Sequence, residues 1–306
     1  MRLMVMGQQA FGKAALEKLI EAGRDEVVAV YCAPDREGRP LDPLKEVALD
    51  LGIPVRQPSG FRNRATLDEM REFGCDLMIM AYVTIFVPEA ARESPRLGSI
   101  CFHPSLLPKH RGPSSINWPI IQGATGTGFS WFHPTDGLDE GDILLQHHCP
   151  IGPDDTLGDV YFRKIFPAAI ESVLEVCDLF RSGNPPRIAQ NDSQASYEGW
   201  CKAADARIDW SRHVDDVYNL VRGTNPQPGA WTEFRGQRLQ IYDARKSAGE
   251  GSPGTVAGMT DDSVVVQAGS GRIDVRRVRP AGKGKIAAVD WAREAGIGPG
   301  DQLGVQ

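Results

Sequence analysis

A histidine and an aspartate stand in settings that suit acid/base chemistry. His103 follows an apolar run over residues 97–102 and opens a loop, 103–108, that two prolines stiffen. Asp139 comes later, in a turn bounded by glycines at 137–141. Strand ends in an open α/β sheet face the ligand crevice, so we expect both side chains there. An imidazole beside a carboxylate predicts proton transfer and stabilisation of developing charge, with His103 and Asp139 as the catalytic pair.

Other candidate motifs fail on their spacing. Residues 7–14, GQQAFGKA, come within one residue of a phosphate-binding P-loop, but Ala14 replaces the hydroxyl that would bind magnesium. The dinucleotide spacing is absent too, so we interpret this segment as a tight turn from strand to helix. The carboxylates of residues 136–142 lack the spacing of a calcium loop. His147 and His148 would point to opposite faces of a strand, so no metal site is predicted.

Strands and helices that alternate over the first 180 or so residues must position the pair. Apolar runs predict strands at 3–6, 27–31, 77–81, 97–102, 129–132 and 143–146. Helical spacing predicts helices at 11–20, 44–51, 65–73, 115–122 and 156–181, with Pro167 dividing the last. The alternation predicts an α/β fold, a Rossmann-like and mostly parallel sheet with helices on both faces.

A second domain follows a break in this pattern. Polar and proline-containing sequence predicts a linker at 184–205, between a catalytic domain at 1–183 and a C-terminal domain at 206–306. After one helix near 214–221, short strands separated by glycine-rich turns predict a small OB-like β-barrel. These strands are predicted at 230–234, 239–242, 254–257, 263–267 and 273–278.

Composition narrows the class of protein. The chain has 306 residues, 41% of them hydrophobic, and its net charge of −6 does not indicate a nucleic-acid-binding protein as a whole. Six cysteines without a C-x-x-C pair predict neither a zinc site nor a disulfide framework. With no signal peptide or membrane span expected, we predict a cytoplasmic location.

The segment 272–285 departs from the acidic average of the chain. It contains six basic residues and a single acidic residue, Asp274, so it either contacts phosphates or carries ordinary surface charge. They are Arg272, Arg276, Arg277, Arg279, Lys283 and Lys285.

Motifs spread over nearly the whole chain are similar to those of the 10-formyltetrahydrofolate-dependent formyltransferases. That family includes methionyl-tRNA formyltransferase and the hydrolase domain of 10-formyltetrahydrofolate dehydrogenase. Residues 103–118 resemble that hydrolase domain most closely. The motifs are Gly7-Gln8, Ala33-Pro34-Asp35 with Leu44-Lys45, His103-Pro104-Ser105-Leu106-Leu107-Pro108 with Arg111-Gly112, the turn 137–142, Ala206–Trp210, Asn225–Trp231, and Val278–Lys283 with Gly298–Asp301.

The resemblance implies that the crevice holds a folate and that His103 and Asp139 are catalytic. It implies 10-formyltetrahydrofolate as co-substrate, tetrahydrofolate as its product, and no metal. The implied folate-binding residues are Ile85, Phe86, Val87, Ser105, Leu106, Leu107, Pro108 and Asp139.

Cys101 departs from the family pattern. Most transferases of the family carry an asparagine two residues before the histidine, and a thiol is a weak donor in its place. Losing an oxyanion donor costs roughly 2.7–4 kcal/mol in comparable acyl-transfer sites. The hydrolase domain of the dehydrogenase lacks that asparagine too. We therefore count Cys101 among the catalytic positions, and disfavour it as a covalent nucleophile because only His103 lies near enough in sequence to activate it.

The acceptor of the formyl group stays open at this point. An amine is the leading prediction, and the C-terminal barrel with its basic residues suggests methionyl-tRNA. The acidic net charge, the short segment 36–43 and Cys101 disfavour methionyl-tRNA. Water, which would make the protein a hydrolase, accounts better for Cys101, and a small amine such as an amino sugar is a further alternative. A folate-binding protein without catalysis is disfavoured by the intact His103 and Asp139.

Overall fold

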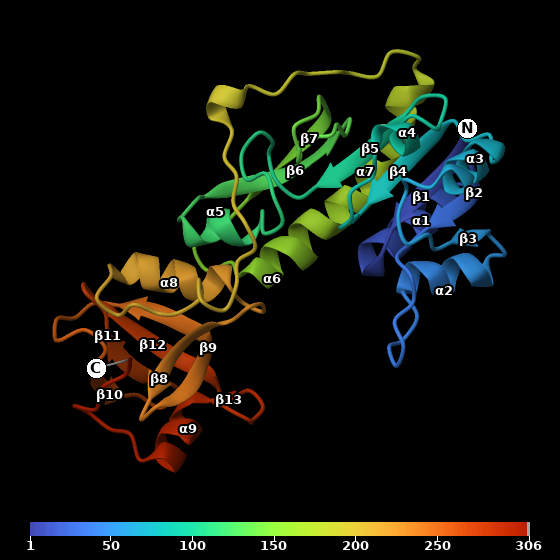
Figure 1. The fold of residues 1–306 in the computed structure, drawn as a ribbon. Helices are drawn as coiled ribbons and strands as arrows, with labels where there is room; N and C mark the ends of the chain where they lie inside the picture. The colour runs from blue at the N-terminus through green and yellow to red at the C-terminus, as the bar shows by residue number, and fades with distance from the viewer. Residues whose placement is uncertain (305–306) are drawn as a thin grey trace. The chain divides into compact units, whose positions relative to one another are not determined.

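The computed structural model describes residues 1–304, and its chain forms two compact units that interleave along the sequence (Figure 1). The first unit comprises residues 1–112, 128–149 and 162–197, and the second comprises 113–127, 150–161 and the chain from 198 onward. The boundaries 1–183, 184–205 and 206–306 remain a prediction. Val305 and Gln306, at the end of the predicted C-terminal domain, lie outside the described residues.

A seven-stranded sheet forms the centre of the first unit, in the order β3-β2-β1-β4-β5-β6-β7. The first five strands pair in parallel and β6 runs antiparallel to β5, which confirms a mostly parallel sheet. Because β1 has β2 on one side and β4 on the other, the chain order reverses there, and such a point opens a crevice at the carboxyl ends of the strands. The strands are β1 (Arg2–Gly7), β2 (Glu26–Tyr31), β3 (Val55–Arg56), β4 (Leu77–Ala81), β5 (Ser99–His103), β6 (Gly126–Phe132) and β7 (Ile143–Pro150).

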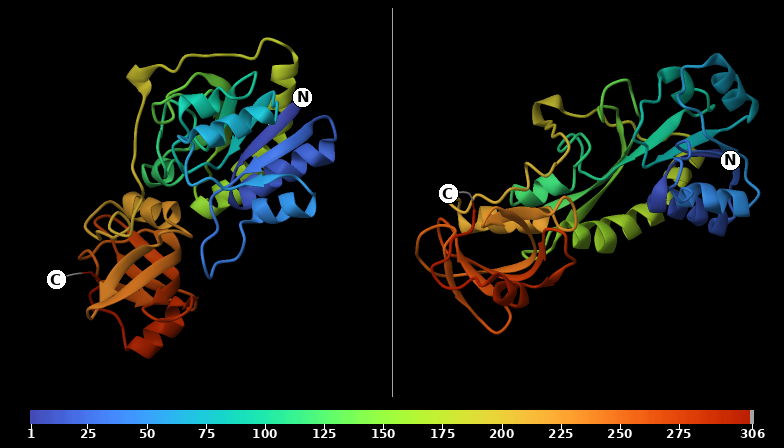
Figure 2. Two further views of the ribbon diagram at one scale, coloured as in Figure 1. Left: turned by 45° about the vertical axis from the view of Figure 1, so that its right-hand side comes forward. Right: turned by 60° about the horizontal axis from the view of Figure 1, so that its bottom comes forward.

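Helices cover both faces of this sheet, as predicted. In Figure 2, α1, α2 and α7 lie on one face and α3 and α4 on the other. Pro167 lies in the first turn of α7, directly after a π-helical turn at Val160–Ile165, so the predicted division of the long helical stretch falls there. The helices of this unit are α1 (Gln9–Ala22), α2 (Pro43–Asp50), α3 (Arg64–Glu72), α4 (Glu89–Arg92) and α7 (Phe166–Arg181), whereas α5 (Asn117–Ile121) and α6 (Leu157–Asp159) belong to the second unit.

The P-loop-like segment is a tight turn closed by a carboxylate. A side chain on Gly7 would place its Cβ 2.0 Å from the Ala81 carbonyl oxygen, so only glycine fits where β1 meets β4. The Gln9 N–H, at the start of α1, donates to both carboxylate oxygens of Asp42 at 2.9 Å. An acidic side chain of the chain itself thus lies where a P-loop would bind phosphate.

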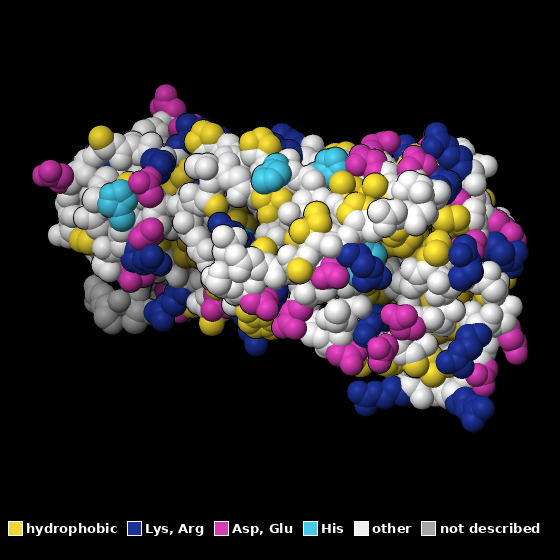
Figure 3. All heavy atoms as spheres, turned by 90° about the horizontal axis from the view of Figure 1, so that it is seen from above, with side chains coloured by type: hydrophobic (Ala, Val, Ile, Leu, Met, Phe, Trp, Pro, Cys, Tyr) yellow, Lys and Arg dark blue, Asp and Glu magenta, His cyan; other side chains and the backbone are white. Residues whose placement is uncertain are grey.

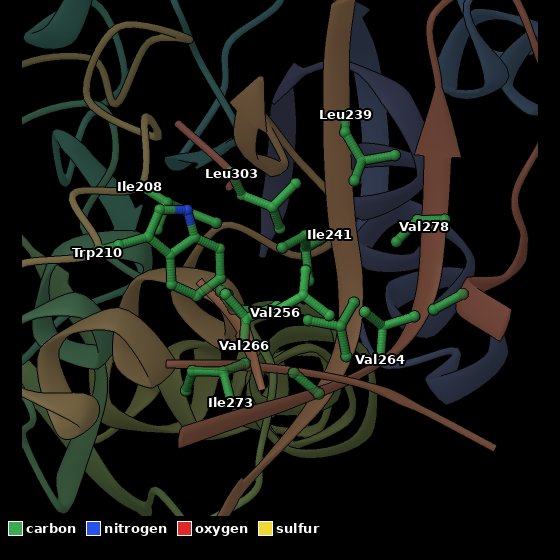
Figure 4. Close-up of a cluster of buried hydrophobic side chains, with 14 of the residues drawn as sticks. Ile208, Trp210, Leu239, Ile241, Val256, Val264, Val266, Ile273, Val278 and Leu303 are labelled. Carbon is green, nitrogen blue, oxygen red and sulfur yellow. The ribbon is translucent and has the colours of Figure 1, made fainter. Parts of the chain in front are cut away.

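An antiparallel six-stranded sheet forms the second unit, in the order β10-β11-β12-β9-β8, with β13 paired to β12. Inward side chains of this sheet, such as Ile241 and Val266, pack with side chains from outside it, such as Trp210, in the apolar core drawn in Figure 4. This arrangement is consistent with the predicted small barrel. The elements are α8 (Val214–Gly223), β8 (Ala230–Phe234), β9 (Gln237–Ser247), β10 (Val256–Met259), β11 (Val264–Gln267), β12 (Arg272–Pro280), β13 (Ile286–Ala287) and α9 (Ala288–Ala295).

A buried phenol in α8 is part of this unit's polar structure. The hydroxyl of Tyr218 donates to Asp154 Oδ1 at 2.6 Å, and only 3% of the residue is exposed. Burial, together with this hydrogen bond to a carboxylate, raises the pKa of Tyr218 to about 12.

The described surface mixes charges of both signs. Basic and acidic side chains are interspersed on the face drawn in Figure 3. Within residues 1–304, no helix has both the length and the apolar character needed to span a membrane.

Candidate functional site

The structure brings His103 and Asp139 together at the carboxyl edge of the sheet. His103 is the last residue of β5, and Asp139 comes from the connection between β6 and β7. Nδ1 of His103 lies 3.5 Å from Oδ2 of Asp139, and their side chains are only 8% and 15% exposed. A proton placed on Nδ1 would face this carboxylate, so the pair can hold one transferable proton between the two side chains.

Backbone groups of His110 and Gly112 hold both members of the pair. The His110 carbonyl lies 2.8 Å from Nε2 of His103 and can only accept, so Nε2 carries a hydrogen. The Gly112 N–H donates to Oδ2 of Asp139 at 2.9 Å. Since Nε2 is already bound to a carbonyl, Nδ1 is the ring nitrogen that remains for chemistry beside Asp139.

Cys101 lies on the same face of β5 as His103. Side chains alternate along a strand, so residues two apart share a face, and the intervening Phe102 stacks on Phe11 on the opposite face, with ring centroids 4.3 Å apart. Cys101 is partly buried and packs against apolar clusters that include Val87 and Leu107. Burial, reinforced by the nearby Asp139 carboxylate, raises the pKa of the Cys101 thiol far above its ordinary value. The thiol is therefore neutral, which argues against a covalent nucleophile.

Two polar side chains, one buried (Ser130) and one half-buried (Gln146), hold the 105–108 loop. The Ser130 hydroxyl donates to the Ser105 carbonyl at 2.6 Å and accepts the Leu107 N–H at 3.1 Å. Gln146 Nε2 donates to the Leu107 carbonyl at 2.9 Å and to the Ser130 hydroxyl at 2.8 Å. Ser105 is fully buried, and its hydroxyl donates to the Lys109 carbonyl at 2.7 Å, so in this structure Ser105 holds the loop together.

Ser130 and Gln146 were not among the predicted site residues. Both are polar residues inside predicted apolar strands, at 129–132 and 143–146, and that exception to the pattern was the signal available in the sequence.

The predicted folate-binding segment 85–87 follows β4 at the same edge. Ile85 and Phe86 are exposed large apolar side chains, whereas Val87 is buried. A buried arginine, Arg92, anchors the segment: Nη1 donates to the Val87 carbonyl at 2.8 Å, and Nη2 donates to the Asp136 carboxylate at 2.8 Å. This single guanidinium therefore links the segment after β4 to the loop that carries Asp139.

Two hollows lie near the sheet, at opposite ends of its strands. A small cavity of about 30 Å³ lies at the carboxyl edge, lined by Gly7, Tyr31 and Ile85 among others. A larger open hollow of about 440 Å³ surrounds Met1 and Asp25, at the far edge. The α-amino group of Met1 is paired with Asp25 at 2.8 Å, so we assign the larger hollow no role in the chemistry.

The six basic residues predicted to contact phosphate belong to the second unit, and two of them have acidic partners. Arg276 lies 3.3 Å from Asp262, and Lys283 lies 2.6 Å from Glu294. Burial and two neighbouring arginines lower the pKa of Lys285. Among residues 1–304, no group of three or more His, Cys, Asp or Glu side chains is placed to hold a metal ion.

Comparison with known proteins points to one kind of chemistry. The model for the family described as Formyl transferase matches residues 1–172, and the model for the C-terminal domain of formyl transferases matches residues 201–296. Methionyl-tRNA formyltransferase of Geobacter metallireducens is 34% identical over 307 residues, covering 99% of this chain and 98% of that protein.

A longer relative and a solved structure are similar as well. Cytosolic 10-formyltetrahydrofolate dehydrogenase of Homo sapiens is 37% identical over 278 residues, which is 88% of this chain but 31% of that protein. This chain thus spans about three tenths of the dehydrogenases that it matches. The crystal structure of HypX from Aquifex aeolicus in complex with tetrahydrofolic acid has a TM-score of 0.67 at 18% identity, covering 96% of this chain and 47% of HypX, which shows likeness of fold.

Proposed function

Because this chain belongs to the formyl transferase family, we propose that it removes the formyl group of 10-formyltetrahydrofolate through His103 and Asp139 and passes it to an amine. The observation that carries the proposal is the pair itself. Its two side chains lie 3.5 Å apart at the carboxyl edge of the sheet, and neighbouring backbone groups hold each of them in place.

The chemistry follows from the two groups. The nitrogen lone pair of the acceptor attacks the formyl carbon, and the carbonyl electrons move onto oxygen as an oxyanion. Protonated His103 stabilises that charge through Nδ1–H, a contribution of the kind that often dominates acyl transfer. Asp139 accepts the proton that the attacking nitrogen loses. When the carbonyl re-forms, the bond to N10 breaks and N10 takes up a proton from the pair, which releases tetrahydrofolate.

The folate is proposed to bind between two segments beside the pair. Ile85 and Phe86 offer exposed apolar surface after β4, while Leu106, Leu107 and Pro108 follow β5. Apolar walls with a few convergent polar groups are typical of a site for a small aromatic ligand. HypX, whose fold is similar, has been solved in complex with tetrahydrofolic acid, which is consistent with this choice of ligand.

Water is the second candidate acceptor, and Cys101 is the observation that favours it. The thiol hydrogen has the Phe102 carbonyl as a partner at 3.7 Å, so no strong donor or acceptor at position 101 is available to orient an amine. In that case formate and tetrahydrofolate would be the products, and the 37% identity to a 10-formyltetrahydrofolate dehydrogenase supports this alternative.

Methionyl-tRNA is the amine that the Geobacter metallireducens relative suggests. We propose the basic residues of β12 and the loop after it, Arg272, Arg276, Arg277, Arg279, Lys283 and Lys285, as its contacts in that case. The ion pairs of Arg276 and Lys283 weaken this proposal, since a paired cation offers less charge to a phosphate.

A cytoplasmic setting is proposed with this function. Cys32, Cys75, Cys101, Cys177 and Cys201 are free thiols, which fits a reducing compartment.

The test measures tetrahydrofolate production from 10-formyltetrahydrofolate, first alone and then with methionyl-tRNA. Product formed only with the tRNA would support the amine acceptor, and rapid product without it would support water. His103→Ala should lower turnover by at least about 10²-fold. His148→Ala, an exposed histidine on β7, is the matched control. Turnover by His103→Ala within twofold of the wild type would refute the proposal.

A further inference from the structure

Gln190 reaches from the segment after α7 to the turn that carries Asp139. Its amide nitrogen donates to the backbone carbonyl of Asp139 at 2.8 Å and to that of Gly141 at 2.7 Å. Its amide oxygen accepts two hydrogen bonds from Arg111, at 3.2 Å from Nε and 2.9 Å from Nη2. Both amide hydrogens and the amide oxygen are thus engaged.

Arg111 is itself held in place. Only 8% of the residue is exposed, and Nη2 also donates to Asp192 at 2.7 Å. The backbone on either side of Arg111 contacts the pair, since the His110 carbonyl binds His103 and the Gly112 N–H binds Asp139. Gln190 therefore connects the 110–112 segment, which orients the pair, with the turn that carries Asp139.

The turn needs such an anchor. Asp139 has φ +57°, a left-handed backbone conformation that most residues avoid and that costs roughly 1–3 kcal/mol. Gly141, two residues on, lies so close to the His133 carbonyl that a Cβ there would be 1.6 Å from its oxygen. The two hydrogen bonds from the Gln190 amide hold the backbone at both of these positions, Asp139 and Gly141.

We propose that Gln190 is a positioning residue that sets the orientation of Asp139 toward His103. The inference rests on the proposed function, in which Asp139 is catalytic. Gln190 acts through the backbone of Asp139, so its loss should lower turnover and leave folate affinity unchanged. A displacement of about 1 Å at a reacting group can cost about 10²-fold in rate.

The Q190E variant distinguishes the role of the amide nitrogen from that of the amide oxygen. Q190E keeps an oxygen for Arg111 and places a carboxylate beside that cation, but it loses both donors to the carbonyls of Asp139 and Gly141. Q190L removes donors and acceptor together without adding charge. Q194E is the matched control, because exposed Gln194 lies only four residues away.

The experiment is a double-mutant cycle on tetrahydrofolate production, with Q190E, Q190L, D139N and D139N/Q190E. Binding of unreactive 5-formyltetrahydrofolate verifies that each variant is folded. We expect Q190E and Q190L to lower kcat about 10- to 100-fold with KM within threefold, and Q194E to match the wild type. In the D139N background, Q190E should lower kcat by less than twofold, because the group that it positions is already gone.

Three results would overturn the inference. If D139N loses turnover while folded Q190E and Q190L keep the wild-type kcat, Gln190 does not position Asp139 although the proposed function stands. If Q190E lowers kcat as much in the D139N background as in the wild type, Gln190 acts independently of Asp139. Wild-type turnover by D139N would remove the proposed function itself and this inference with it.

Discussion

Replacing Cys101 with asparagine is expected to shift the reaction toward an amine acceptor. Cys101 and His103 are two residues apart on β5 and share a face, so their Cα atoms are about 6.6 Å apart along the strand. An oxygen that accepts hydrogen bonds of about 2.9 Å from two donors needs those donors no more than about 5.8 Å apart. Two neighbouring side chains on this face need to converge by only about 0.8 Å to meet this limit. An amide at position 101 and the imidazole of His103 can therefore bind one oxyanion together.

The expected gain follows from the value of one such donor. An oxyanion donor contributes roughly 2.7–4 kcal/mol, or about 10²–10³-fold in rate, when its geometry is optimal. The amide must also be buried among the apolar side chains that now surround the thiol, and an unsatisfied amide group there would cost about 1–3 kcal/mol of stability. The oxyanion forms in hydrolysis as well, so this donor should raise both rates. The ratio shifts because the amide oxygen of the asparagine can also accept a hydrogen bond from the attacking amine, which the thiol cannot offer. One such hydrogen bond contributes roughly 0.5–1.5 kcal/mol, so we expect formyl transfer to an amine to rise about 10-fold relative to hydrolysis, with a loss of stability of about 1–3 kcal/mol.

The assay measures two products in one reaction mixture. Total tetrahydrofolate reports both reactions, and the formylated amine reports transfer alone, with methionyl-tRNA and methionine amide as separate acceptors. Cys101→Ser and Cys101→Ala are the controls, since neither places an amide near the oxyanion. A folded Cys101→Asn variant with the wild-type ratio of transfer to hydrolysis for both acceptors would refute the idea that position 101 selects the acceptor.

Three further predictions concern the structure around the site and the second unit. Ser130→Ala removes two hydrogen bonds to the 105–108 loop and should raise KM for 10-formyltetrahydrofolate about 10-fold, measured by steady-state kinetics; an unchanged KM would contradict that role. Arg92→Gln frees the 85–87 segment and should weaken 5-formyltetrahydrofolate binding about 10-fold in calorimetry, whereas equal affinity would refute the proposed anchor. Tyr218 has its pKa raised from 10.0 to about 12 in the folded state, so it contributes about 2–3 kcal/mol below pH 10 that is lost as the pH rises through 12. The gap in urea stability between the wild type and Tyr218→Phe should therefore narrow between pH 10 and 12, and a constant gap would contradict the assignment.

Much of the fold could be predicted because apolar runs and turns mark strands locally. The strand at Leu77–Ala81 and the one at Ala230–Phe234 were predicted with their observed bounds. The two-residue strands β3 and β13 were not predicted, since two residues cannot display a period. The interleaving of the two compact units along the sequence was not predicted either, because it depends on contacts between segments that are distant in sequence.

Some residues of the site could likewise be predicted from the sequence, and one could not. The structure brings together the predicted His103, Asp139 and Cys101, which motifs had marked. Gln190 was missed because it lies in a polar stretch predicted as a linker, where a glutamine has no local pattern to set it apart. Its role depends on hydrogen bonds across 51 residues of sequence, which only the folded chain displays.

The central claim, that His103 and Asp139 form the catalytic pair, is tested most directly by single-turnover formation of tetrahydrofolate from 10-formyltetrahydrofolate in Asp139→Asn. The asparagine keeps the size of the side chain and its contact with the Gly112 N–H, but it cannot accept a proton. We predict a rate at least about 10²-fold below that of the wild type, with 5-formyltetrahydrofolate affinity within threefold. A single-turnover rate within twofold of the wild type would contradict the claim.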